Sequence, residues 1–128
     1  MARGYTVATI ALALQVPPKW VDNVLSHFEI PAVRQGRQGI ARQLAPAAVM
    51  QLAIVKDLVE TLRVPLARAI SAARDLLSDG HLSVGPELIV TVDREARWKM
   101  LAGTLELAIE AAPLPKRGRP GGKAKRGA

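Results

Sequence analysis

The chain has 128 residues, of which 49% are hydrophobic, and a formal net charge of +7. This length suits one domain with a short appendage. The absence of Cys excludes disulfides, thiolate zinc sites and thiol nucleophiles. The apolar run from Val7 to Leu14 is too short to cross a membrane and lacks a signal-peptide cleavage site. We therefore expect a cytoplasmic protein without a membrane partner.

The first predicted elements are two short helices joined by a tight turn. Apolar residues recur with helical spacing from Tyr5 to Leu14. Pro17 and Pro18 then open a second helix, because proline is tolerated in a first turn. This helix should run to Phe28 and turn its polar side chains outward. The inward residues are Val21, Val24, Leu25 and Phe28, and the outward ones are Lys19, Asp22, Asn23 and Ser26. Such a pair predicts a helix-turn-helix.

A basic segment follows, from Ala32 to Pro46. Gly36 and Gly39 favour a turn at its tip, and the three arginines around the tip are Arg34, Arg37 and Arg42. No acidic residue occurs between Ile30 and Lys56. The pattern predicts a wing-like hairpin whose arginines contact phosphates or a flanking minor groove. The simpler alternative is a surface loop that happens to be basic.

Two further helices are predicted next. Helical spacing returns after Pro46 and continues to about Val64, with an apolar face that includes Leu62. Pro65 starts the following helix, and the sequence Ser78-Asp79-Gly80 ends it. The inward residues of the two helices are predicted to be Val49, Leu52, Val55, Leu58, Val59 and Leu62, then Leu66, Ile70, Ala73, Leu76 and Leu77.

A β-hairpin and a last helix complete the body. Gly85-Pro86 separates two runs between His81 and Asp93, and the second run alternates as a strand does. Asp93 then caps a helix that continues to about Ala112. Its apolar face and the free edge of the hairpin both favour a homodimer. The apolar residues of this helix are Trp98, Leu101, Leu105 and Ile109.

The order of these elements resembles the MerR-type winged helix-turn-helix domain over about Tyr5 to Leu77. The resemblance implies that the second helix and the wing bind double-stranded DNA, through Lys19, Asn23, Ser26, Arg34, Arg37 and Arg42. The matching motifs are Tyr5-Thr6-Val7, Val16-Pro17-Pro18, Ile30-Pro31-Ala32, Gly39 with Arg42, and Val64-Pro65-Leu66.

The chain also departs from the MerR pattern at two places. The family often has an Arg followed by aromatic residues in its recognition helix, where this chain has Asp22, Asn23 and Val24. Leu44 replaces an aromatic residue near the end of the wing. A carboxylate at Asp22 would repel phosphate unless it faces a base edge or pairs with a nearby basic residue.

The segment from Pro113 to Ala128 carries six of the 18 basic residues and none of the 11 acidic ones. Its Gly and Pro content predicts a disordered tail. The sequence Lys116-Arg117-Gly118-Arg119-Pro120 resembles the AT-hook. Gly118 would let the backbone approach the floor of an A·T-rich minor groove, Arg117 and Arg119 would lie along that floor, and Pro120 favours an extended path. Non-specific attraction to nucleic acid is the alternative, because clustered cations gain affinity by counterion release.

The sequence therefore predicts a mainly α fold with short β elements. It comprises a winged helix-turn-helix over residues 1–80, a dimerising β-hairpin and C-terminal helix over 81–112, and a disordered basic tail over 113–128. His27 is expected at the end of the second helix and His81 in a turn, without metal-binding neighbours. No nucleophile, base and orienting group can be assembled, so we expect no enzyme, cofactor or metal. The sequence gives no basis for inferring a small-molecule effector.

Three functions remain open at this point. The first is a bacterial transcriptional regulator or nucleoid-associated factor that binds double-stranded DNA, with a preference for A·T-rich sites. The second is a phage or mobile-element factor that bends DNA as excisionases do. The third is a protein-interaction module with a tail that binds nucleic acid non-specifically.

Overall fold

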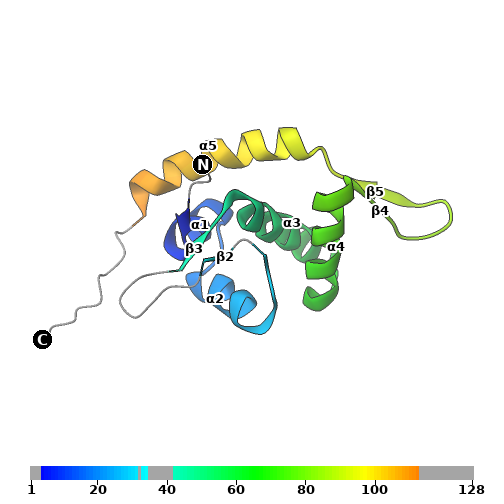
Figure 1. Ribbon diagram of the computed structural model, residues 1–128, viewed down its shortest axis with the longest axis horizontal. Helices are drawn as coiled ribbons and strands as arrows, with labels where there is room; N and C mark the ends of the chain where they lie inside the picture. The colour runs from blue at the N-terminus through cyan, green and yellow to red at the C-terminus, as the bar shows by residue number, and fades with distance from the viewer. Residues whose placement is uncertain (1–3, 32, 35–41, 113–128) are drawn as a thin grey trace, which may run out of the picture.

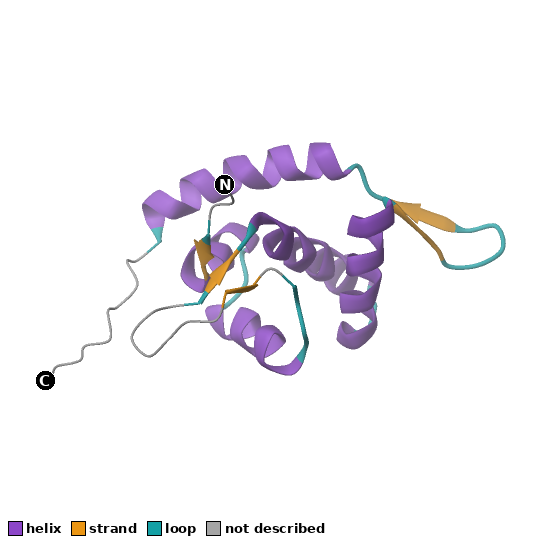
Figure 2. Ribbon diagram, viewed as in Figure 1, coloured by secondary structure: helices purple, strands orange, loops and turns teal. Residues whose placement is uncertain are grey.

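The computed structural model describes residues 4–31, 33–34 and 42–112 (Figure 1). Within these residues the protein is mainly helical, with a few short strands in two small sheets (Figure 2). No helix in these ranges is long and apolar enough to cross a membrane. The predicted basic tail, residues 113–128, and the predicted tip of the basic hairpin, residues 35–41, lie outside the described residues.

The chain begins with a short strand and two helices. β1 (Tyr5–Thr6) leads directly into α1 (Val7–Leu14), and α2 (Pro18–His27) follows after a three-residue turn. Thr6 caps α1 because its hydroxyl oxygen accepts a hydrogen bond from the Thr9 N–H (3.2 Å). Gln15 ends α1 in the left-handed conformation, at φ 59°. The helix therefore starts two residues later than the apolar spacing indicates, and the prediction of helix at β1 was wrong.

Three very short strands form the first sheet. β2 (Val33–Arg34) and β3 (Gln43–Leu44) run antiparallel, with Val33 opposite Leu44 and Arg34 opposite Gln43. β1 lies on the other side of β3, where Tyr5 faces Leu44, so the strand order is β1-β3-β2. Leu44 is fully buried. The two strands bring the roots of the predicted basic hairpin together beside the start of α1.

α3 (Pro46–Leu62) is the central helix of the molecule and packs most extensively against α4 (Leu66–Asp79). Residues 48–55 of α3 are all buried, so helices and strands surround it in this stretch. Gln51 is buried among them, and its side-chain N–H donates to the Ile70 carbonyl of α4 (3.2 Å). Leu62 was predicted to lie inward but is 58% exposed, because the last turn of α3 extends past the buried stretch.

The second sheet is a hairpin of β4 (His81–Ser83) and β5 (Ile89–Thr91), which projects away from the helices in Figure 1. Gly80 ends α4 at φ 81°, as its position predicted, and its N–H donates to the Leu76 carbonyl (2.8 Å). His81 begins β4 and does not lie in the expected turn.

The last helix, α5 (Arg94–Ala111), runs back across the molecule and packs against α1 (Figure 1). The predicted cap is confirmed, since the Asp93 carboxylate accepts a hydrogen bond from the Ala96 N–H (3.0 Å). Leu101 and Leu105 are buried in the same core as residues from α1, α2, α3 and α4. α5 thus shares one hydrophobic core with the preceding helices, and Leu82 and Val90 of the hairpin pack against that core while partly exposed.

Candidate nucleic-acid interface

α2 presents a polar face to solvent. Lys19, Asn23 and Ser26 are exposed, whereas Val21 and Val24 are buried. The helical period of 3.6 residues separates the two faces, and burial of the two valines fixes which side of α2 points outward. The predicted orientation of this helix is confirmed.

Asn23 lies at the middle of this polar face. Its backbone carbonyl lies 2.8 Å from Nδ1 of His27, which stands at the end of α2 as expected. Its side-chain amide makes no hydrogen bond within the described part of the chain. An exposed amide with both a donor and an acceptor is able to form two hydrogen bonds with a base edge.

Asp22 connects this face to the root of the basic hairpin. Its Oδ1 lies 3.9 Å from Nη1 of Arg42, which directly precedes β3. The distance is too long for a hydrogen bond, and Arg42 Nη1 is buried without an acceptor among the described residues. Asp22 therefore lies close to a cation that offsets its charge. A nearby basic residue is one of the two ways in which a carboxylate at this position could avoid repelling phosphate.

The other predicted site residues are only partly within the described chain. Arg34 lies on β2, opposite Gln43 in the register of the sheet. Arg37 lies outside the described residues. The predicted tail residues also lie outside them, namely Lys116, Arg117, Gly118, Arg119 and Pro120. The structure thus brings together Lys19, Asp22, Asn23, Ser26 and Arg42 in one region.

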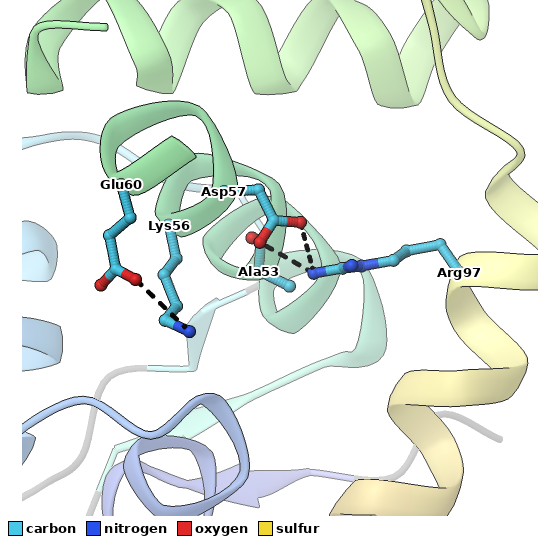
Figure 3. Close-up of polar contacts among 5 residues, drawn as sticks. All are labelled: Ala53, Lys56, Asp57, Glu60 and Arg97. Carbon is cyan, nitrogen blue, oxygen red and sulfur yellow. Dashed lines mark hydrogen bonds and ion pairs between the residues drawn. The ribbon is translucent and has the colours of Figure 1, made fainter. Parts of the chain in front are cut away.

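A second polar group joins α3 to α5 (Figure 3). Nη2 of Arg97 lies 2.8 Å from the Asp57 carboxylate and donates a longer hydrogen bond to the Ala53 carbonyl (3.4 Å). Lys56, the residue before Asp57 on α3, pairs with Glu60 one turn further along the helix (3.7 Å). The sequence alone does not indicate this group, because Arg97 and Asp57 lie 40 positions apart and carry no shared motif.

An open cleft of about 230 Å³ lies beside this group, between α1, α3 and α5. Leu14, Met100 and Leu101 contribute its apolar lining, and Arg97 with Asp57 contributes charge. The two cations that line the cleft, Lys56 and Arg97, are each paired with a carboxylate. These pairs leave no excess positive charge in the cleft for a ligand. Among the described residues, no group of His, Asp and Glu is suited to holding a metal ion.

Comparison with models of protein families, with curated proteins and with solved structures finds no match to this chain.

Proposed function

We propose that the protein binds double-stranded DNA as a winged helix-turn-helix, with α2 as the recognition helix and the β2–β3 hairpin as the wing. In this proposal Lys19, Asn23 and Ser26 enter the major groove. Arg34, Arg37 and Arg42 contact phosphates or the adjacent minor groove. The biological role would be that of a bacterial transcriptional regulator or nucleoid-associated factor in the cytoplasm.

The observation that carries the proposal is that α2 and the root of the β2–β3 hairpin, which lie apart in the sequence, are close together in the structure. α2 exposes an uninterrupted polar face, and the Asp22–Arg42 pair places the root of the arginine-bearing hairpin beside that face. A major groove about 12 Å wide admits one helix, so a flanking hairpin meets the phosphates at the groove edge. The basic tail adds sequence-independent attraction to the same partner.

Footprinting on genomic DNA fragments tests this function. We expect a protected segment of duplex DNA with A·T-rich flanks, and weaker binding of single-stranded RNA at equal salt concentration. Single-stranded RNA that competes as well as duplex DNA would contradict the proposal and favour a tail-driven, non-specific binder. Strong in-phase bending by several bound copies would instead assign the protein to the DNA-bending factors.

A further inference from the structure

The β4–β5 hairpin has a strand edge with unused hydrogen-bonding groups. At its tip the Val84 N–H donates to the Leu88 carbonyl (2.9 Å), and at its root the Val92 N–H donates to the carbonyl just before β4 (3.1 Å). Bonded and non-bonded pairs alternate along an antiparallel ladder. The N–H and C=O groups of Ile89 and Thr91 therefore point away from β4. Within the described chain this sheet has two strands, so no strand lies beside those four groups.

The composition of this edge does not protect it. Residues 88–92 read Leu-Ile-Val-Thr-Val, with no charge and four β-branched side chains. Exposed edges are usually blocked by charged residues or proline, because an open edge is a template for another strand. The β4 side differs, since it carries His81 and is followed closely by Pro86. The outer edge of β5 is therefore the side of the hairpin that is open to pairing.

One face of the hairpin is apolar and extends past the body of the protein. Leu82 and Val90 lie opposite one another and are half-buried against the core. The next pair toward the tip, Val84 and Leu88, is 47% and 62% exposed. An isolated two-stranded hairpin is at best marginally stable in water, so an additional covering surface would stabilise the distal half.

We propose that β5 pairs antiparallel with β5 of a second copy of this chain, about a two-fold axis at Val90. The two hairpins then form one four-stranded sheet. Ile89 of each copy lies opposite Thr91 of the partner subunit, where the outward N–H and C=O groups form hydrogen bonds. Val90 faces Val90 of the partner subunit in a non-hydrogen-bonded pair. This symmetric contact pairs the open β5 edge of each copy with the other, so the assembly stops at a dimer and does not propagate.

The same register covers the exposed apolar tip. Because the hairpins run in opposite directions, Leu88 lies beside Val92 of the partner subunit on the apolar face. Glu87 at the tip reaches the root of the other hairpin. The guanidinium group of Arg94 lies at that root, where it donates to the carbonyl groups at the end of α4 (2.9 and 3.3 Å). The opposite charges favour this antiparallel orientation over a parallel one.

The outer face of α5 is the competing surface for a dimer. Met100 and Leu107 are each 73% exposed there, but the charged residues Lys99 and Glu110 also lie on the exposed side of the helix. It offers no unpaired backbone groups, which makes β5 the stronger candidate. The β5 contact is short and belongs among the small interfaces typical of weak association. We therefore expect a monomer–dimer equilibrium that depends on protein concentration in the micromolar range.

Cysteine cross-linking tests the register, because the natural chain has no Cys. A non-hydrogen-bonded pair places Cα atoms about 4.5 Å apart, which lies within the range that a disulfide spans. We expect Val90→Cys to form a covalent dimer under mild oxidation without DNA. Leu82→Cys is the matched control, on the same face but one strand away from the axis, and should stay monomeric on a non-reducing gel. Equal cross-linking of both variants, or of Leu82→Cys alone, would overturn the proposal.

Sedimentation of full-length variants tests the edge by a second route. Thr91→Pro removes an outward N–H of β5 and should shift the protein to monomer. Ser83→Pro removes the equivalent outward N–H of β4 and should leave the dimer intact, with circular dichroism checking the fold of both. Leu88→Gln should weaken dimerisation without altering any backbone group. If Thr91→Pro and Leu88→Gln dimerise as the natural protein does and Leu107→Gln does not, the dimer forms through α5 and the proposal is wrong. These measurements use no DNA, so their failure leaves the proposed function untouched.

Discussion

Asp22 is the single carboxylate on α2, and it lies within the face that we propose to contact DNA. Its side chain is 56% exposed and that of its partner Arg42 is 30% exposed, with 3.9 Å between the charged atoms. A pair of this kind contributes little to folding, typically about 1 kcal/mol or less. Its larger effect is on the charge that a phosphate backbone would meet near α2.

We predict that Asp22→Asn raises affinity for random duplex DNA, because the change removes a negative charge near the phosphates. The gain should be up to about 1 kcal/mol at low salt and should shrink as salt is added. Fluorescence anisotropy at several salt concentrations measures it, and thermal unfolding should change little. A loss of affinity for random DNA would show that Asp22 makes a favourable contact or positions Arg42.

Asn23 tests whether α2 reads bases. Asn23→Ala should cost about 1–3 kcal/mol at the specific site, since a bidentate contact to adenine is lost, and little on random DNA. Thr104→Ala is a suitable control, because Thr104 is an exposed polar residue on α5, which lies on a different side of the molecule from α2 (Figure 1). Equal losses for Asn23→Ala on both kinds of DNA would remove Asn23 as a base-reading residue.

The helices are held in place by a few specific polar contacts in addition to apolar packing. Gln51 joins α3 to α4, and Arg97 joins α3 to α5 through Asp57. The first contact is buried, whereas the second is partly exposed to solvent. Burial makes the loss of a hydrogen bond more costly, because the remaining groups have no water to replace it.

Gln51→Ala should therefore reduce the free energy of unfolding by about 1–3 kcal/mol. Ser71→Ala serves as its control, since Ser71 lies one residue after Ile70, is exposed, and makes only a long hydrogen bond to Ala67 (3.5 Å). The control should stay within about 0.5 kcal/mol of the natural protein in chemical denaturation. Equal stability of both variants would mean that the Gln51–Ile70 bond contributes nothing net.

The basic hairpin offers a prediction about DNA affinity. Arg37→Ala should weaken binding to most sequences and lower the salt dependence, because a phosphate contact carries no sequence information. Arg68→Ala removes the same charge from the exposed surface of α4 and should have a smaller effect. Chemical-shift mapping that leaves residues 33–44 unaffected by DNA would refute the wing, whatever the tail does.

The uneven distribution of charge over the whole chain leads to a separate prediction for the tail, residues 113–128. The tail holds six positive charges, while the rest of the chain is almost neutral. If the rest of the chain binds DNA as proposed, its covalent link to residues 113–128 would keep these charges close to that DNA and raise their effective concentration. Tail and body should therefore bind adjacent stretches of one duplex.

Removal of residues 113–128 should flatten the slope of log K against log salt by up to about five units, since six phosphate contacts are lost. Gly118→Val keeps all six charges and separates the AT-hook from plain electrostatics. It should abolish the preference for A·T-rich flanks and the competition by minor-groove ligands. If the variant prefers A·T-rich flanks as the natural protein does, the tail is an electrostatic anchor and its AT-hook motif is coincidental.

Local patterns in the sequence were enough to predict the five helices of the described residues, the second hairpin and the outward face of α2. They depend on residues a few positions apart, such as Asp93 and Ala96 at a helix cap, so the sequence contains them directly. β1 was missed because two residues cannot display a strand alternation. The sequence also extended the buried face of α3 to Leu62, since spacing alone does not say where neighbouring helices end.

Contacts between distant residues were decided by the tertiary structure. Asp22 meets Arg42, and Arg97 meets Asp57, only because burial of the apolar faces fixes how the helices pack. The strand order β1-β3-β2 likewise depends on where α1 and α3 place the chain around Leu44. The sequence by itself determined the helices, most of the residues they bury and the positive charge of residues 113–128. Packing of those faces determined which polar groups became neighbours, because such contacts have no signature of local spacing.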